Sequence, residues 1–261
     1  MKGLRPIFAV GATLLLLLLG TATASAGGLS SITCAGGSIA AGTYRSITIT
    51  GLCLVDSGKV VVERDVTVAP GGGLEAVFSG SNLIVERNLD VEEGGLLALG
   101  CSPLLGDFLC MNDPAGSTHH VIRGSIVATG AVLMIVHNDK IAGNVRQTGG
   151  GGGLTCNPLF PNGPPPYTDY NGDRIGGSVT VSGLQTCWSG FLGNTVWGSV
   201  TWNNNNTVIP DGNLMGTNTV HEDLNCFDNS PLPHLSDVTP LPNTVGDVAR
   251  GQCRALSVVG D

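Results

Sequence analysis

The chain has 261 residues, of which only 12% are charged, and its formal net charge is −8. An acidic chain without a basic stripe argues against nucleic acid and against anionic membrane surfaces as partners. The 40 glycines and the low charge favour strands and tight turns over helices.

The N-terminal segment has the features of a secretory signal. Two basic residues precede a short apolar run, and Ala24-Ser25-Ala26 supplies the small residues that a signal peptidase reads. We expect residues 1–26 to be a signal peptide and residues 27–261 to form one domain. The run is short for a membrane anchor, which needs about 20 apolar residues. We therefore expect a secreted, extracellular protein with no membrane span after signal cleavage.

A repeat of about two dozen residues follows. Residues 61–74, VVERDVTVAPGGGL, and 84–97, IVERNLDVEEGGLL, are identical at seven of fourteen positions. A looser pattern, in which three small or polar residues separate two apolar ones, then recurs down the chain. The final apolar residues of this pattern are Val66, Leu89, Ile126, Val145, Val179, Val200 and Leu224. Most of their spacings match one coil of a parallel β-helix, so we expect these side chains to form one buried stack.

Corners and loops complete this prediction. The short polar residues just before the apolar column are expected to stack as a polar ladder at a corner; they are Asp65, Asn88, Ser125, Asn144, Ser178, Ser199 and Asp223. Gly- and Pro-containing segments near 101–117 and 149–173 predict inserted loops. We therefore predict an all-β, single-stranded parallel β-helix of about eight coils, for which right-handed winding is the default. A β-sandwich is the alternative, and it leaves the one-coil period unexplained.

Eight cysteines lie after the signal, and in an exported protein an even number predicts disulfides. We expect neighbours in sequence to pair, which gives Cys34–Cys53, Cys101–Cys110, Cys156–Cys187 and Cys226–Cys253. The first and last of these bonds would pin the end coils. A zinc site is disfavoured because the chain has no C-x-x-C pair.

Several motifs carry a resemblance to a known group. They include Val181-Ser-Gly-Leu-Gln-Thr-Cys-Trp188 and the closing pattern Leu224-Asn-Cys-Phe-Asp-Asn-Ser-Pro231, Pro242-Asn-Thr-Val245 and Gly251-Gln-Cys253. On these motifs the chain resembles secreted actinobacterial proteins of unassigned function that are predicted to be β-helical. The resemblance implies secretion and a parallel β-helix, and it implies no reaction. The chain departs from the group at coil corners such as Glu63-Arg-Asp, where Gly-Gly-Asn is usual.

One segment could carry polysaccharide chemistry. Cleavage of a glycan needs paired carboxylates, or a base together with a cation held by carboxylates. His137, Asp139 and Lys140 place a base, a carboxylate and a cation within four residues. The competing interpretation, which we favour, is a solvated corner in which Asp139 makes a turn, because fold alone does not license function. We therefore assign no catalytic residue and keep this set as the alternative.

Two further features concern ligands. Asp169, Asn171 and Asp173 place oxygen ligands at alternate positions, as in a calcium loop, but Arg174 stands where that loop needs Gly. We expect no cofactor, with Ca²⁺ as the alternative. Trp197 occupies an outer column, where an exposed ring would stack on a sugar; we favour its lying under an insertion loop.

The sequence favours a non-enzymatic cell-surface, matrix or glycan-binding structural module whose partner is an extracellular glycan or cell-wall polymer. One alternative is a polysaccharide-acting enzyme, a lyase before a hydrolase. A second alternative is a self-assembling surface protein that pairs its coil ends.

Overall fold

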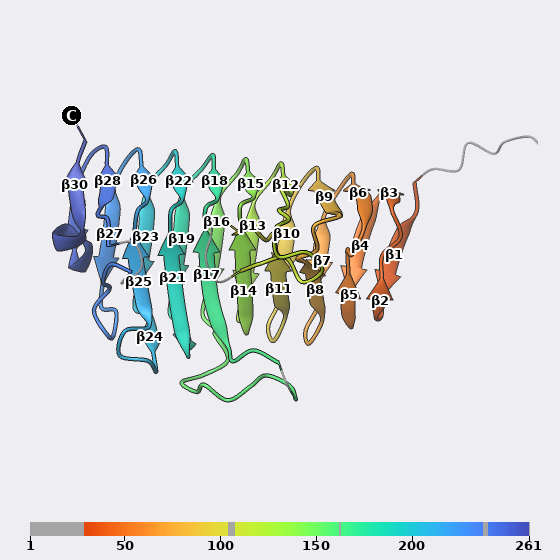
Figure 1. Cartoon of the computed structure of the whole chain (residues 1–261), viewed down its shortest axis with the longest axis horizontal. Coiled ribbons are helices and arrows are strands. Elements are labelled where there is room, and N and C mark those ends of the chain that lie inside the picture. The colour runs from red at the N-terminus through yellow and green to blue at the C-terminus, as the bar shows by residue number, and fades with distance from the viewer. Residues whose placement is uncertain (1–28, 104–107, 162, 237–239, 261) are drawn as a thin grey trace, which may run out of the picture.

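The computed structural model, which describes residues 29–103, 108–161, 163–236 and 240–260, winds into a parallel β-helix (Figure 1). Three long sheets run side by side along the helix axis, and strands that are one coil apart pair in parallel. A β-sandwich of antiparallel sheets is thereby excluded. The predicted signal peptide, residues 1–26, lies outside the described residues. In the described part of the chain, no helix is both long and apolar enough to cross a membrane.

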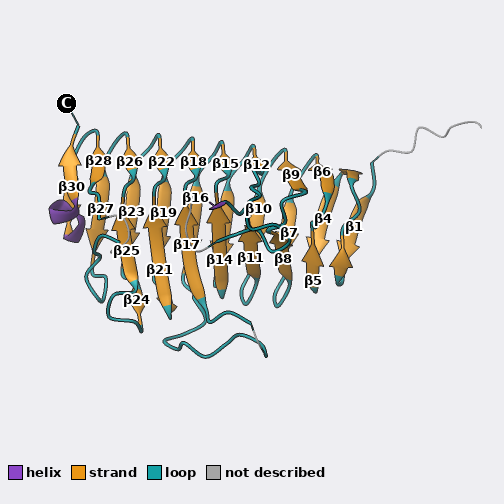
Figure 2. Ribbon diagram, in the orientation of Figure 1, coloured by secondary structure: helices purple, strands orange, loops and turns teal. Residues whose placement is uncertain are grey.

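The first eight coils each contribute one strand to each of the three sheets in turn, and the last two coils contribute strands to only two of them (Figure 2). Sheet A contains β1 (Ser31–Cys34), β4 (Ser46–Ile49), β7 (Val66–Val68), β10 (Leu89–Val91), β13 (Ile126–Thr129), β16 (Val145–Thr148), β19 (Val179–Ser182), β23 (Val200–Asn203), β27 (Leu224–Phe227) and β29 (Ala249–Gly251). Sheet B contains β2 (Gly37–Ser38), β5 (Leu52–Leu54), β8 (Gly73–Ala76), β11 (Leu96–Leu99), β14 (Leu133–His137), β17 (Tyr167–Asn171), β21 (Trp188–Leu192) and β25 (Asn213–Gly216).

Sheet C closes the triangular coil. It contains β3 (Gly42–Tyr44), β6 (Gly58–Val62), β9 (Ser81–Val85), β12 (Val121–Ile122), β15 (Lys140–Ile141), β18 (Arg174–Ile175), β22 (Thr195–Val196), β26 (Thr219–Val220), β28 (Asn243–Val245) and β30 (Ser257–Val259). A small fourth sheet pairs β20 (Gln185–Thr186) with β24 (Asn206–Thr207). Because strands in a sheet lie about 4.8 Å apart, the ten strands of sheet C span roughly 43 Å.

The predicted apolar column forms one buried stack along sheet A. Val66 pairs with Leu89, Leu89 pairs with Ile126, and the register continues without a break to Leu224. Every member of the column is 0–1% exposed. The prediction is therefore confirmed, and Ile47 extends the stack by one coil toward the N-terminus.

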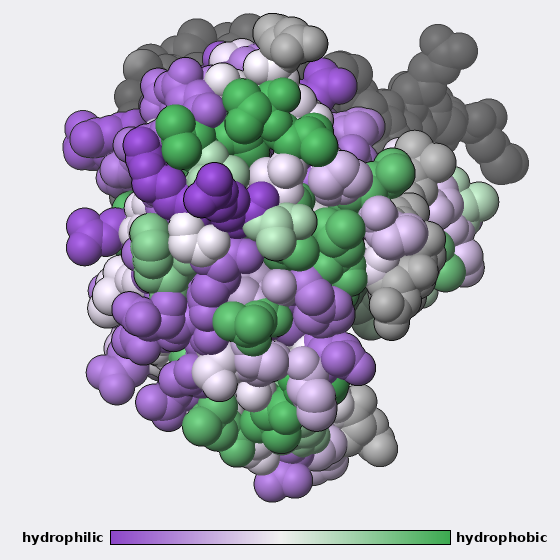
Figure 3. All heavy atoms as spheres, turned by 90° about the vertical axis from the view of Figure 1, so that its left-hand side faces the viewer, coloured by the Kyte–Doolittle hydropathy of each residue, from purple (hydrophilic) through white to green (hydrophobic). Residues whose placement is uncertain are grey.

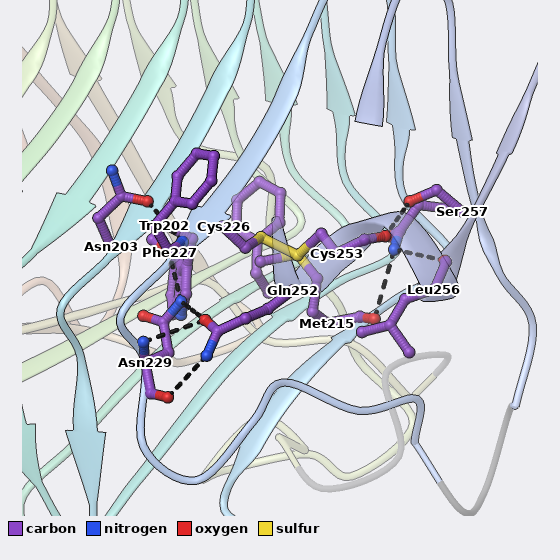
Figure 4. Close-up of a disulfide and its surroundings, with 12 residues drawn as sticks. Trp202, Asn203, Met215, Cys226, Phe227, Asn229, Gln252, Cys253, Leu256 and Ser257 are labelled. Carbon is purple, nitrogen blue, oxygen red and sulfur yellow. Dashed lines mark hydrogen bonds between the residues drawn. A yellow bond between two sulfur atoms is a disulfide. The ribbon is translucent and has the colours of Figure 1, made fainter. Parts of the chain in front are cut away.

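Sheets A and C have ten strands each, two more than the expected eight coils. The additional coils lie at the ends, where one side of each strand has no neighbouring coil and the apolar repeat is absent. At the C-terminal end, the 3₁₀ helix η2 (Gln252–Leu256) lies between β29 and β30, where earlier coils have a strand of sheet B. Gln252 exchanges hydrogen bonds of 2.8 and 2.9 Å with Asn229 beside the Cys226–Cys253 disulfide (Figure 4).

All four predicted disulfides are present. Cys34–Cys53 joins β1 to β5 in the first coils, and Cys226–Cys253 joins β27 to η2 in the last. These two bonds pin the end coils, as expected. Because disulfides persist in oxidising compartments, four of them indicate an extracellular type of environment.

The predicted polar ladder is also confirmed. Between sheets C and A, the Asn88 N–H donates to Asp65 Oδ1 at 3.1 Å, and the Ser125 N–H donates to Asn88 Oδ1 at 3.0 Å. The Asn144 N–H continues the ladder by donating to Ser125 Oγ at 3.0 Å. Asn144, Ser178 and Asp223 likewise accept a backbone N–H of the next coil, whereas Ser199 Oγ donates to Glu222 Oε2 at 2.8 Å. Most of these short side chains therefore satisfy a backbone donor where the turn interrupts the sheet ladder.

The two insertions lie against the outer face of sheet B. Phe108 from the first and Leu159 from the second pack on a small outer core made by Val77, Ala98, Leu133 and Ile135. The second insertion ends earlier than predicted, because residues 167–171 form β17. Sheet B is therefore partly covered, while the insertions leave part of the outer face of sheet C open.

Candidate functional site

Two unpaired cations stand on the outer face of sheet C. Lys140 and Arg174 occupy the exposed positions of β15 and β18, while the residues that follow them, Ile141 and Ile175, point into the core. Their Cα atoms are register partners, so the two side chains leave the sheet about 4.8 Å apart. In the described part of the chain, the ion pairs are Arg123–Glu86, His137–Asp169 and Arg250–Asp223, so neither cation has a carboxylate partner.

A shallow groove lies beside these cations. We call it the sheet C groove; it has a volume of about 470 Å³ and is lined by Lys140, Ile141, Ala142, Arg174, Gly176 and Trp197. The small residues Ala142 and Gly176 form the floor of the groove, since they occupy equivalent positions of two successive coils. A Cβ on Gly176 would lie only 2.4 Å from the Ala142 carbonyl oxygen, so the close approach of the two coils requires glycine there. The tight corner that the fold needs thus also opens the groove.

Trp197 forms one wall of the groove. The side chain is 49% exposed and stacks on His221 of the next coil, with ring centroids 5.6 Å apart and an angle of 14° between the planes. His221 covers one face of the indole, and the opposite face looks along the column toward Gly176. The interpretation that an insertion loop covers Trp197 is therefore wrong, because both insertions pack on sheet B. Trp202, by contrast, is fully buried inside the helix, where it pairs in register with Val181.

A second hollow adjoins the groove at Lys140 and Arg174. It has a volume of about 280 Å³, and His119, Asn138 and Asp139 contribute to its lining. His119 is exposed, with Nδ1 3.1 Å from the Asn138 carbonyl oxygen. The hollow therefore extends the cationic surface toward the corner between sheets B and C.

His137 and Asp169 meet beneath the first insertion. They project from the neighbouring strands β14 and β17, and His137 Nε2 lies 2.7 Å from Asp169 Oδ2. Both side chains are buried, and the Phe108 ring stands edge-on to the imidazole with centroids 4.2 Å apart. Within the part of the chain that the structure describes, His137 Nδ1 and Asp169 Oδ1 have no hydrogen-bond partner. The fold thus pairs His137 of the alternative catalytic set with Asp169 of the alternative calcium set, but both side chains are buried from solvent.

Asp139 and Asp173 are rungs of a buried ladder at the corner between sheets B and C. Asp139 Oδ1 accepts the His120 N–H at 2.8 Å, and Asp173 Oδ1 accepts the Asp139 N–H at 2.9 Å. The ladder continues through Asn194, whose Oδ1 accepts the Asp173 N–H at 2.9 Å, and then through Asn218 and Asn243. Asp139 does belong to a corner, as favoured, but the corner is buried rather than solvated.

Burial sets the ionisation of both ladder carboxyls. Desolvation raises the pKa of Asp139 above its ordinary value, although His120 acts in the opposite direction. Desolvation raises the pKa of Asp173 well above its ordinary value, and the neighbouring Asp139 carboxyl adds to the rise. Both Oδ2 atoms are buried, and no described residue forms a hydrogen bond with either. These carboxyls therefore have a structural role at the corner between sheets B and C, and they do not line the sheet C groove.

The alternative calcium ligands do not lie in a loop. Asp169 and Asn171 belong to β17, and Asp173 follows at the ladder corner. Among the described residues, no three His, Cys, Asp or Glu side chains form a cluster that could hold a metal ion. Polar interior contacts occur in the same coil, where Tyr170 Oη donates to Gln147 Oε1 at 3.0 Å.

Sequence reasoning missed several groove residues. From the sequence, Arg174 is only a break in a calcium loop, and Ala142 and Gly176 are only two of the small residues that separate the apolar ones in the looser repeat pattern. The available signal was the column itself, because aligning coils by register places Ala142, Gly176, Trp197 and His221 in one line.

Comparison with family models, curated proteins and solved structures finds no match to this chain.

Proposed function

We propose that this protein is a secreted β-helix that binds an extracellular glycan in the sheet C groove without cleaving it. The single observation that carries the proposal is the half-exposed Trp197 ring, whose free face lies above a floor of small residues. Sugar rings present C–H groups that pack on the electron-rich face of an aromatic ring, and hydroxyls that reach neighbouring polar groups. Stacking on His221 holds the indole in place before any ligand arrives, which lowers the entropic cost of binding.

The placement of the acidic groups favours binding over cleavage. A glycosidase needs two carboxyl groups that face each other across the scissile bond. Asp139, Asp169 and Asp173 are each 0–2% exposed and contact protein groups. Lys140 reaches the surface, and among the described residues it forms no ion pair with a carboxylate. The polysaccharide-acting enzyme therefore stays the weaker alternative.

Self-assembly through coil ends has less support than glycan binding. Val258 and Val259 of β30 are exposed at the C-terminal end, which would suit pairing with another chain. However, η2 and its disulfide cover part of this end, and its apolar residues lie in separate patches between hydrophilic ones (Figure 3). A flat, continuous apolar end is what assembly would require.

The test is retention of the mature protein on a panel of immobilised glycans, with and without Ca²⁺, while new reducing or unsaturated ends are assayed. We expect retention without new ends, and a loss of about tenfold in affinity in Trp197→Ala, since aromatic stacking and burial contribute on the order of 1–2 kcal/mol. Phe227→Ala is the matched control, because Phe227 is 42% exposed and belongs to sheet A.

Two results would overturn the proposal. One is equal glycan retention by Trp197→Ala and the wild type. The other is the appearance of new ends that disappear in Asp139→Asn while its thermal unfolding stays normal. Asn is chosen because Asn194 and Asn218 already fill equivalent rungs of the ladder.

A further inference from the structure

We propose that the sheet C groove selects acidic glycans, whose carboxylate or sulfate groups bind Lys140 and Arg174. This inference rests on the proposed function and names its ligand class. Lys140 and Arg174 lie on neighbouring coils and line both the groove and the adjoining hollow. A glycan stacked on Trp197 would therefore reach both cations from the same groove.

Among the described residues, the two cations have no carboxylate partner, although the chain is acidic. Acidic side chains outnumber basic ones by 20 to 12, yet neither Lys140 nor Arg174 is paired with one among the described residues. By contrast, Arg123, which directly follows β12 one coil before β15, is bonded to Glu86 at 2.8 Å. The outward positions of β15, β18, β22, β26 and β28 hold no Asp or Glu. This face is consequently a local positive surface on an acidic protein, and it would attract anions.

The geometry suits a carboxylate on a sugar. Arg174 offers a planar fork that can bind a carboxylate or sulfate through two parallel hydrogen bonds, and Lys140 adds a flexible ammonium about one strand spacing away. Trp197 lies one coil beyond Arg174 and two residues along, about 8 Å from it by the strand dimensions. A ring on the indole and an acidic group on the cations would be neighbouring parts of one saccharide chain.

Ala142 provides a sharp test of this charge preference. It is exposed on the groove floor two residues along from Lys140, and Gly176 separates it from Trp197 in the same column, so a longer side chain can be introduced without disturbing the core. Ala142→Glu places a carboxylate beside Lys140 and Arg174, and Ala142→Gln has the same shape without the charge. The two variants therefore separate electrostatics from steric filling.

The experiment measures affinity for polygalacturonate and for neutral galactan at low and moderate salt. We expect polygalacturonate to bind the wild type at least tenfold more tightly, with the preference falling as salt rises. We expect Ala142→Glu to weaken polygalacturonate binding about tenfold relative to Ala142→Gln, with galactan binding equal in the two variants. Lys140→Gln/Arg174→Gln should lose the preference while keeping the stacking on Trp197. A sulfated glycan and single-stranded DNA complete the set of probes.

The outcomes separate the two proposals. If galactan and polygalacturonate bind equally, and Trp197→Ala weakens both, the acidic preference is wrong while the glycan-binding proposal stands. If polygalacturonate, galactan, the sulfated glycan and every member of the glycan panel all fail to bind, both proposals fail. If single-stranded DNA binds more tightly than both acidic glycans, the groove recognises phosphates and the acidic-glycan inference is overturned.

Discussion

Replacing Asp173 by Asn should stabilise the protein, because Asp173 occupies a ladder position built for an amide. In the next rungs, Asn194 Nδ2 donates to the Tyr170 carbonyl at 2.9 Å, and Asn218 Nδ2 donates to the Phe191 carbonyl at 2.7 Å. By register, the equivalent acceptor for residue 173 is the Val136 carbonyl. A carboxylate cannot donate to a carbonyl, and Asp173 Oδ2 is buried without a partner.

The magnitude follows from the missing hydrogen bond. An unsatisfied buried polar group costs roughly 1–3 kcal/mol, and a new bond adds about 1 kcal/mol. We expect Asp173→Asn to raise the free energy of unfolding by ~2 kcal/mol at pH 7. For a domain of this size, that corresponds to about 4–8 °C in Tm.

The sign of the pH dependence follows from the raised pKa. Because burial raises the pKa of Asp173 in the folded state, the folded protein binds this proton more tightly than the unfolded chain does. The stability that the protonated carboxyl contributes is complete below the ordinary pKa of 3.8 and is lost as pH rises through the folded pKa. Wild-type stability should therefore fall as pH rises above about 4, and Asp173→Asn should remove much of that slope.

Urea unfolding from pH 4 to pH 8 measures both effects. Asp211→Asn is the control, because it makes the same chemical change at an exposed turn and should leave the midpoint unchanged. The reasoning is refuted if Asp173→Asn lowers the midpoint at pH 7, or if its pH slope equals that of the wild type.

Other predictions concern buried pairs and disulfides. Asp169→Ala should lower the free energy of unfolding by about 2–3 kcal/mol, because it removes the group that His137 Nε2 contacts and leaves that nitrogen buried. Asp169→Asn should lower the free energy of unfolding by less. Equal urea midpoints for the two variants would contradict this prediction. Replacing both Cys226 and Cys253 by Ser should cost ~3.5 kcal/mol, whereas the same change at Cys101 and Cys110 should cost ~2.5 kcal/mol, because the closed loop is shorter. Denaturation under non-reducing conditions checks the order, and a larger loss at the shorter loop would refute it.

The regular parts of the fold were predictable because they obey a periodic rule. Val66, Leu89 and their successors must be apolar, since neighbouring coils exclude water from both sides of each strand. The corner ladder through Asp65 and Asn88 follows from the need of each turn to satisfy backbone donors. Disulfides between sequence neighbours follow because a coiled chain brings such residues close together.

The irregular parts broke that rule for identifiable reasons. The strand β17 was assigned to a loop because its inward residues, Thr168 and Tyr170, are not aliphatic. They are tolerated inside because both hydrogen-bond to Gln147, at 3.0 Å each. The sequence makes Asp139 an alternative catalytic carboxylate and Asp173 an alternative calcium ligand, since nothing in a single sequence marks an Asp that replaces Asn in a ladder. The repeat aligns Ala142, Gly176 and Trp197 in one column, but the sequence does not show which face the insertions cover and so does not show that this column is open.

Mapping where a ligand contacts the protein tests the central claim most directly. Backbone and indole NMR signals of the mature protein would be followed during titration with a galacturonate oligomer. We predict that the largest shifts occur in β15, β18 and β22, together with the Trp197 indole N–H. Saturable shifts confined to sheet A, or to the insertions over sheet B, with the Trp197 indole signal unmoved, would contradict a binding groove on sheet C.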